Sequence, residues 1–82
     1  MLDAKIVGRV IQEYREREHL SQEVLSGLAD IGRSHLSAIE RGERRPTLDT
    51  FFKIADALNI GPSVLMNAIE TEIEEEQKKE TY

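Results

Sequence analysis

The residues best suited to chemistry lie between positions 33 and 41, where polar and basic side chains recur at helical spacing. Leu36 and Ile39 form the apolar side of this segment, and hydroxyl and guanidinium groups lie on the side away from them. That polar side can donate hydrogen bonds and carries positive charge, which are the properties needed to read base edges in DNA. The residues on it are Arg33, Ser34, Ser37 and Arg41.

A pair of short helices is predicted to position these side chains. A turn-prone run, residues 30–32, separates the segment from an earlier apolar set at helical spacing. Ser21 can cap the first helix, and Gly42 can end the second in a left-handed conformation. Helices this short do not fold alone, so both are expected to pack against other elements. The earlier apolar set consists of Leu25, Leu28 and Ala29.

Three further helices complete the predicted secondary structure, and no strand is expected. Asp3 can cap the first of them, Thr47 precedes the second, and Pro62 opens the third at its favoured first position. Asn59 is expected to be left-handed, and Phe52 to be half buried. In chain order the predicted helices cover residues 3–18, 21–29, 33–41, 48–58 and 62–76.

The run from Leu20 to Gly42, LSQEVLSGLADIGRSHLSAIERG, resembles the helix-turn-helix of phage repressor/Cro-type regulators, the Xre family. The later runs RRPTL and IADAL extend the likeness over about residues 6 to 65. The resemblance implies an all-α fold, a compact five-helix, lambda-repressor-like DNA-binding domain. That domain would cover residues 1–69, followed by an acidic C-terminal helix extension or tail, residues 70–82. The chain departs from the usual family residues at Ser26, Asp30 and Gly32.

The resemblance also implies roles for individual residues. In this family the second helix of the motif enters the major groove with its N-terminus first. The residues implied to read bases are Arg33, Ser34, Ser37 and Arg44, and those implied to contact phosphates are Gln22, His35 and Arg45.

Arg15 and Glu40 match the family positions that form a structural ion pair. A buried carboxylate needs a partner, and a planar guanidinium can satisfy both of its oxygens. The alternative is that Arg15 is an ordinary surface charge.

The charge is unevenly distributed. The net charge of the 82 residues is −5, but residues 66–82 alone carry six glutamates against two lysines. Residues 33–45 carry four arginines against two glutamates. Because such distributions govern partners more than fold, the acidic tail does not exclude DNA binding by the remainder.

A stripe of apolar residues in the last helix is longer than closing a core requires. Met66, Ile69 and Ile73 are therefore predicted to form a homodimer interface, because a two-fold assembly needs a self-complementary apolar patch. The competing interpretation is that Ile69 and Ile73 fold back on Ile6 and Val10 of the same chain.

Together these observations predict a sequence-specific transcriptional regulator, repressor- or Cro-like, that reads a palindromic operator in double-stranded DNA as a homodimer. The alternative is a protein-interaction module of the same fold, such as an antitoxin that binds a toxin. No enzyme, metal site or cofactor is expected, since the chain has no cysteine and its two histidines fall on different elements. No apolar run is long enough for a membrane span, so a cytoplasmic protein is expected.

Overall fold

The computed structural model describes residues 2–80, and within them it contains five α-helices and no strand. This confirms the predicted all-α class. The first four helices match their predicted bounds to within one residue at either end, whereas the fifth continues four residues further than predicted. The helices are α1 (Ala4–Arg17), α2 (Gln22–Leu28), α3 (Arg33–Glu40), α4 (Leu48–Ala57) and α5 (Pro62–Glu80).

Side-chain caps begin three of the helices, as the sequence predicted. At each of these starts a side-chain oxygen accepts a hydrogen bond from a backbone N–H of the first turn, which has no partner within the helix. Helix α3 differs, because its N-cap is Gly32 and has no side chain to accept. The acceptors are Asp3, Ser21 and Thr47, and the donors are the amides of Lys5, Val24 and Thr50.

The same closure ends each of the first four helices. One left-handed residue follows the helix, and the next amide donates to a carbonyl five residues earlier, as Leu20 does to Arg15 at 3.1 Å. This confirms the left-handed conformations predicted for Gly42 and Asn59, and His19 and Asp30 end their helices in the same way. The four left-handed residues are His19, Asp30, Gly42 and Asn59, with φ between 55° and 77°.

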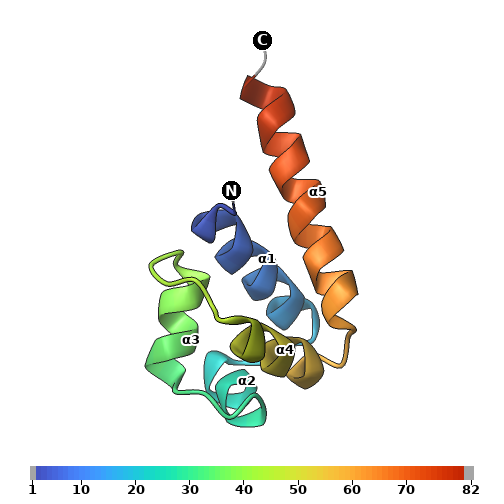
Figure 1. The fold of residues 1–82 in the computed structure, drawn as a ribbon. Coiled ribbons are helices and arrows are strands. Elements are labelled where there is room, and N and C mark those ends of the chain that lie inside the picture. Colours follow the sequence, from blue (N-terminus) through green and yellow to red (C-terminus); the bar gives the residue numbers. More distant parts are fainter. Residues whose placement is uncertain (1, 81–82) are drawn as a thin grey trace.

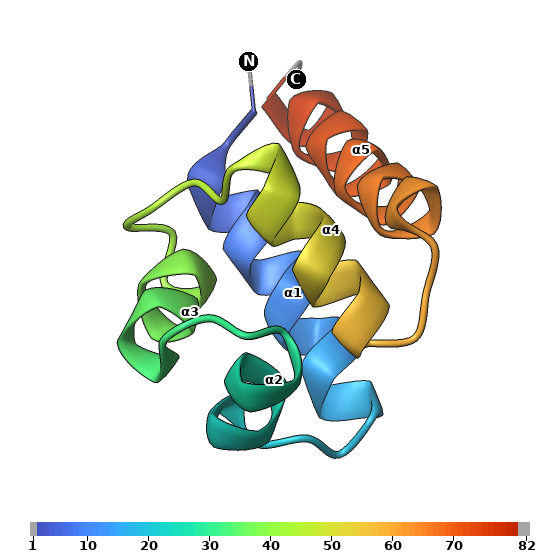
Figure 2. The same cartoon turned by 60° about the horizontal axis from the view of Figure 1, so that its bottom comes forward.

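Helix α1 lies at the centre of the arrangement, with α3 on one side and α5 on the other (Figures 1 and 2). Helix α2 contacts both α3 and α4, and α4 packs against α5. The molecule measures 42 × 23 × 23 Å. All five helices supply completely buried side chains to one core, among them Ile11, Leu25, Leu36, Ile39, Ile54, Leu65 and Ile69.

Gly8 lets the backbones of α1 and α3 approach closely. A Cβ atom at this position would lie 2.2 Å from the carbonyl oxygen of Ile39 and 2.6 Å from that of Glu40. Both oxygens belong to backbone in the last turn of α3, so neither can move aside like a flexible side chain. The sequence pattern gave no sign of this close approach at Gly8. Its lack of a side chain fixes how closely α3 is held against the central helix.

The position of Ile69 contradicts its predicted role in the dimer interface. It is 0% exposed and lies in the core of the single chain, where it lines a small cavity with Val7 and Phe51. The competing interpretation was therefore right for Ile69, whereas Met66 and Ile73 remain partly exposed. Helical spacing could not separate these cases, because residues three or four apart share one broad face of a helix.

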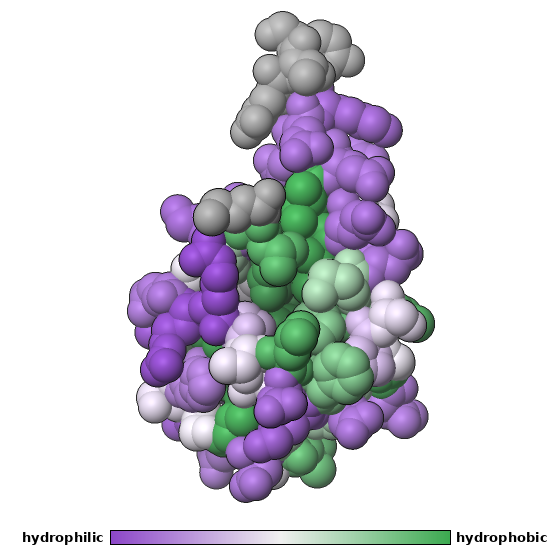
Figure 3. Space-filling model, viewed as in Figure 1, coloured by the Kyte–Doolittle hydropathy of each residue, from purple (hydrophilic) through white to green (hydrophobic). Residues whose placement is uncertain are grey.

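Apolar side chains instead gather on a surface formed by the N-terminal segment, α4 and α5 (Figure 3). Phe52 is 56% exposed, close to its predicted half burial, and Leu48, one turn earlier in α4, is 73% exposed. Two hollows lie next to each other in this surface, because Leu2 and Met66 line both of them. We define the α4–α5 apolar face as Leu2, Leu48, Met66 and Ile73, which line these hollows, together with the exposed Phe52 one turn after Leu48 in α4.

Helix α5 runs without a break through residue 70, the predicted start of the acidic C-terminal extension. Its acidic part is attached to α1, because Arg9 lies 3.4 Å from Glu72 and 3.6 Å from Glu76. The last two residues of the predicted tail, 81 and 82, lie outside the described residues. Within residues 2–80, none of the helices has the length and apolar character needed to cross a membrane.

Candidate nucleic-acid interface

Helix α3 presents the predicted base-reading residues on its outer side. Leu36 and Ile39 are completely buried and anchor the inner side in the core. Arg33 and Ser34, in the first turn, are exposed, and Ser37 is partly exposed one turn later. The separation of an apolar inner side from a polar outer side follows from the helical spacing of these residues. The outer side offers hydroxyl and guanidinium donors to a ligand.

The loop between α3 and α4 adds two further arginines beside this surface. Arg44 and Arg45 are both exposed, and Arg45 Nη2 donates to the backbone oxygen of Leu2 at 3.3 Å. Among the residues that the structure describes, Arg33 and Arg44 have no hydrogen-bond or ion-pair partner. Their guanidinium groups therefore retain all five N–H donors for a ligand. His35, implied as a phosphate contact, is partly exposed on α3.

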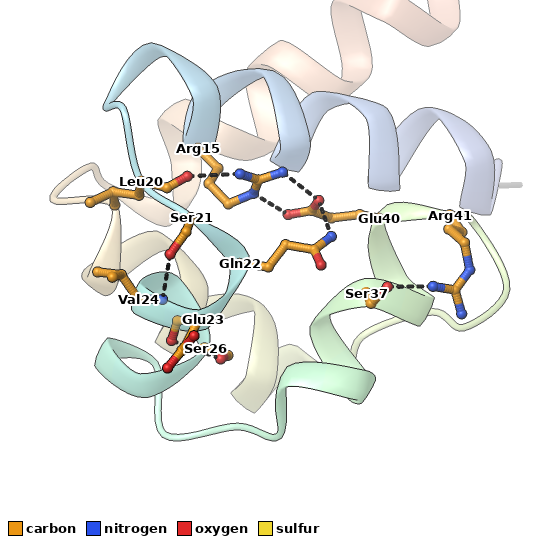
Figure 4. Close-up of polar contacts among 10 residues, drawn as sticks. All are labelled: Arg15, Leu20, Ser21, Gln22, Glu23, Val24, Ser26, Ser37, Glu40 and Arg41. Atoms are coloured by element: carbon orange, nitrogen blue, oxygen red, sulfur yellow. Dashed lines mark hydrogen bonds and ion pairs between the residues drawn. The ribbon is translucent and has the colours of Figure 1, made fainter.

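Arg41, at the C-cap of α3, differs from these free arginines. Its Nε donates to Glu43 Oε2 at 2.9 Å, and its Nη2 donates to Glu43 Oε1 at 3.0 Å. Its Nη1 donates to Ser37 Oγ (Figure 4). The hydrogen bonds with Glu43 raise the pKa of Arg41 and lower the pKa of Glu43. Helical spacing predicted the place of Arg41 on the polar face but not its partner two residues later.

Behind this surface, Arg15 and Glu40 form a buried ion pair (Figure 4). Arg15 Nε donates to Glu40 Oε2 at 2.8 Å and Arg15 Nη2 donates to Glu40 Oε1 at 3.0 Å. Their side chains are only 11% and 2% exposed, so Arg15 is not an ordinary surface charge. The hydrogen bonds to Glu40 raise the pKa of Arg15 above its ordinary value. The pair ties the last turn of α3 to α1.

Two further hydrogen bonds extend the ion pair to the other elements of the motif. Arg15 Nη1 donates to the carbonyl oxygen of Leu20 at 2.7 Å, just before α2. Gln22 Nε2, in the first turn of α2, donates to Glu40 Oε1 at 2.9 Å. Gln22 is partly exposed. Its side-chain amide, which the resemblance implies contacts phosphate, is therefore also held in place by the buried Glu40 carboxylate. The network fixes α1, α2 and α3 relative to one another, and no buried side-chain polar atom within residues 2–80 lacks a partner.

Comparison with known proteins gives consistent matches over most of the chain. A family model described as helix-turn-helix matches residues 11–65. The immunity repressor protein of Bacillus phage phi105 is 39% identical over 71 residues, which cover 87% of this chain and 49% of that repressor. Thus the chain spans about half the length of that relative.

Solved structures of restriction–modification controller proteins have the same fold. The controller protein C.AhdI from Aeromonas hydrophila is 37% identical with a TM-score of 0.75, over 79% of this chain and 98% of that one. The C.Esp1396I controller tetramer, solved in complex with its natural 35 base-pair operator, is 26% identical with a TM-score of 0.81. That match covers 89% of this chain and 96% of the controller.

Proposed function

The chain belongs to the phage repressor/Cro-type helix-turn-helix family, the Xre family, and on that premise we propose that it is a sequence-specific DNA-binding transcriptional regulator that reads a palindromic operator as a homodimer. The observation that carries this proposal is the outer side of α3. It presents Arg33, Ser34 and Ser37 to solvent, and Arg33 has no partner within residues 2–80. The relatives named as a repressor and as controller proteins support the same function.

In the proposed complex α3 enters the major groove with its N-terminus first. Arg33, in the first turn, is then the long donor closest to the bases, and an arginine fork matches the O6 and N7 acceptors of guanine. Ser34 and Ser37 contact further base edges, and Arg44 extends the reading from the adjacent loop. Phosphate contacts by Gln22, His35 and Arg45 set the register of the protein on the duplex without carrying sequence information.

The roles of Arg33 and Arg45 predict two different binding defects. Arg33→Ala is expected to cost about 1–3 kcal/mol on the preferred site and to relax selection at one base position per half-site. Arg45→Ala is expected to lower the affinity for all DNA sequences alike. It should also make the plot of log affinity against log salt shallower, by the amount of about one phosphate contact. Titrations of both variants against matched and mismatched duplexes at several salt concentrations measure these effects. If Arg33→Ala leaves the ranking of duplexes unchanged, Arg33 does not read a base.

The α4–α5 apolar face is the surface that we propose for the homodimer. A single reading helix covers one half-site, and regulators of this kind read two half-sites about one helical turn apart. A two-fold dimer needs one patch that pairs with itself. This face replaces the interface predicted from sequence, because it keeps Met66 and Ile73, omits the buried Ile69 and adds the exposed side chains of α4.

Charges placed on this face are expected to separate the dimer without unfolding the chain. Leu48→Glu combined with Phe52→Glu alters two exposed side chains, so the variant should stay folded, sediment as a monomer and lose operator affinity. Leu28→Glu is the matched control, since Leu28 is a leucine on α2, outside the face, whose 62% exposure lies between those of Leu48 and Phe52. Analytical ultracentrifugation measures the outcome. A double variant that remains dimeric places the interface elsewhere.

A further inference from the structure

Arg41 shares the outer side of α3 with the proposed base-reading residues, yet its charge is already taken up within the chain. Arg33, Ser37 and Arg41 are four residues apart, so they occupy successive turns of one helical face. Arg33 has no partner within residues 2–80, whereas Arg41 holds the Glu43 carboxylate through Nε and Nη2 at 2.9 and 3.0 Å. Of these two arginines on one face, one is neutralised by a carboxylate of the chain and the other is not.

The Glu43 carboxylate occupies the part of Arg41 that a nucleic acid would use. A guanidinium binds an anion most strongly through two parallel N–H donors, and phosphate, carboxylate and the guanine edge all match this fork. Both donors of the Nε/Nη2 edge are taken by Glu43, and Nη1 points to Ser37 Oγ. Glu43 thus holds the position that a phosphate or a guanine would take.

We propose that Glu43 is an internal competitor for Arg41, which lowers the affinity of the chain for DNA and whose displacement makes Arg41 an additional DNA contact. This inference rests on the proposed function. Arg41 and Glu43 are 55% and 60% exposed, and exposed ion pairs contribute little stability, so a phosphate or base can take the place of Glu43. Once displaced, the carboxylate remains near the phosphates and repels them.

The competitor has a direct consequence for specificity. Before a base or phosphate can bind Arg41, the Arg41–Glu43 ion pair must break. Only a duplex that aligns well with α3 makes a contact with Arg41 that compensates for this loss. Sequences that bind through phosphates alone gain less from Arg41 than a matched operator does. Glu43 is therefore a specificity-determining residue that acts through Arg41, and discrimination against a wrong partner is one of the ways in which such specificity is built.

Neutralising Glu43 tests this inference. Glu43→Gln is expected to raise affinity for an unrelated duplex by about fivefold, the scale of a lost exposed ion pair. The plot of log affinity against log salt should become steeper by about 0.9, the slope change for one more phosphate contact. The probes are a duplex selected from a random pool and an unrelated duplex of equal length, each titrated at several salt concentrations with the full chain.

Two matched variants separate this mechanism from a general effect of charge. Glu74→Gln removes the same charge from an exposed position of α5, and it should change neither the affinity nor the salt slope. Combining Glu43→Gln with Arg41→Gln should abolish the gain, because the released guanidinium is then absent. Circular dichroism checks that all variants are folded, as expected for exposed positions.

The possible outcomes distinguish this inference from the proposed function. If Glu43→Gln behaves like Glu74→Gln while the wild-type chain binds DNA, the inference is wrong and the proposed function stands. A gain that persists without Arg41 also overturns the inference, since Glu43 then acts only as a local negative charge. A wild-type chain that binds neither duplex overturns the proposed function and this inference together.

Discussion

Replacing Glu40 by glutamine is expected to destabilise the fold by roughly 3–5 kcal/mol, because it leaves the Arg15 guanidinium buried without its counter-charge. Arg15→Met should have a similar cost, since it leaves the Glu40 carboxylate 2% exposed and removes the donor to the Leu20 carbonyl. Losses of this size are a large fraction of the stability of a small domain. Urea unfolding followed by circular dichroism measures them.

The double variant provides the decisive comparison. With both charges removed, no unpaired ion remains in the interior, so the combined cost should be much smaller than the sum of the single costs. Gln22→Leu is a useful companion, because it removes only the third member of the network and leaves the ion pair intact. Additive single effects of less than about 1 kcal/mol would contradict the buried pair.

Gly8→Ala is expected to destabilise the protein, although alanine is the better helix former. The added methyl group would lie 2.2 Å from the Ile39 carbonyl oxygen, so α1 and α3 must separate to admit it. Overpacking of this kind costs roughly 1–3 kcal/mol and outweighs the gain of about 1 kcal/mol in helix propensity. Because α3 moves with the contact, DNA affinity should fall as well. Thermal unfolding and DNA titration measure the two effects.

Gly27→Ala is the matched control for this prediction. Gly27 lies inside α2, and a Cβ atom there would meet nothing within 4 Å. The same substitution should therefore stabilise the protein by about 0.8–1 kcal/mol through helix propensity alone. Opposite signs at the two glycines are the expected result. If Gly8→Ala also stabilises the protein, α1 and α3 do not approach each other as closely as described.

The secondary structure was predictable because it depends on local signals. Caps at Asp3, Ser21 and Thr47 and left-handed residues at helix ends act within a few positions of the chain, and they mark most boundaries to within one residue. The end of α5 was predicted too early. Its glutamate-rich part is held by Arg9, a residue 63 positions from Glu72, and such a pairing leaves no local signal.

The candidate site was predictable in its residue types but not in all of its contacts. Helical spacing assigned Arg33, Ser34 and Ser37 to the outer side of α3, and the family resemblance identified the Arg15–Glu40 pair. The spacing could not show that Ile69 faces the core while Met66 and Ile73 stay partly exposed, because this depends on where α1 and α4 lie.

Contacts between separate elements were the least predictable part. Gln22 lies 18 residues from the carboxylate that orients it, and Gly8 matters only because of the backbone of α3. The Arg41–Glu43 pair is close in sequence, so an arginine followed two residues later by a glutamate was a signal that could have been used. The geometry of this ion pair still depends on the left-handed Gly42 between the two residues.

The decisive measurement of DNA recognition is the selection of bound duplexes from a random DNA pool, followed by a salt titration of the winning sequence. We expect a two-fold symmetric consensus whose half-sites lie about one helical turn apart, and a log affinity that falls linearly with log salt. Substituting Arg33 should then weaken selection at one symmetric pair of positions. A pool that remains unenriched, while the protein is folded, would contradict the proposal that this chain reads DNA.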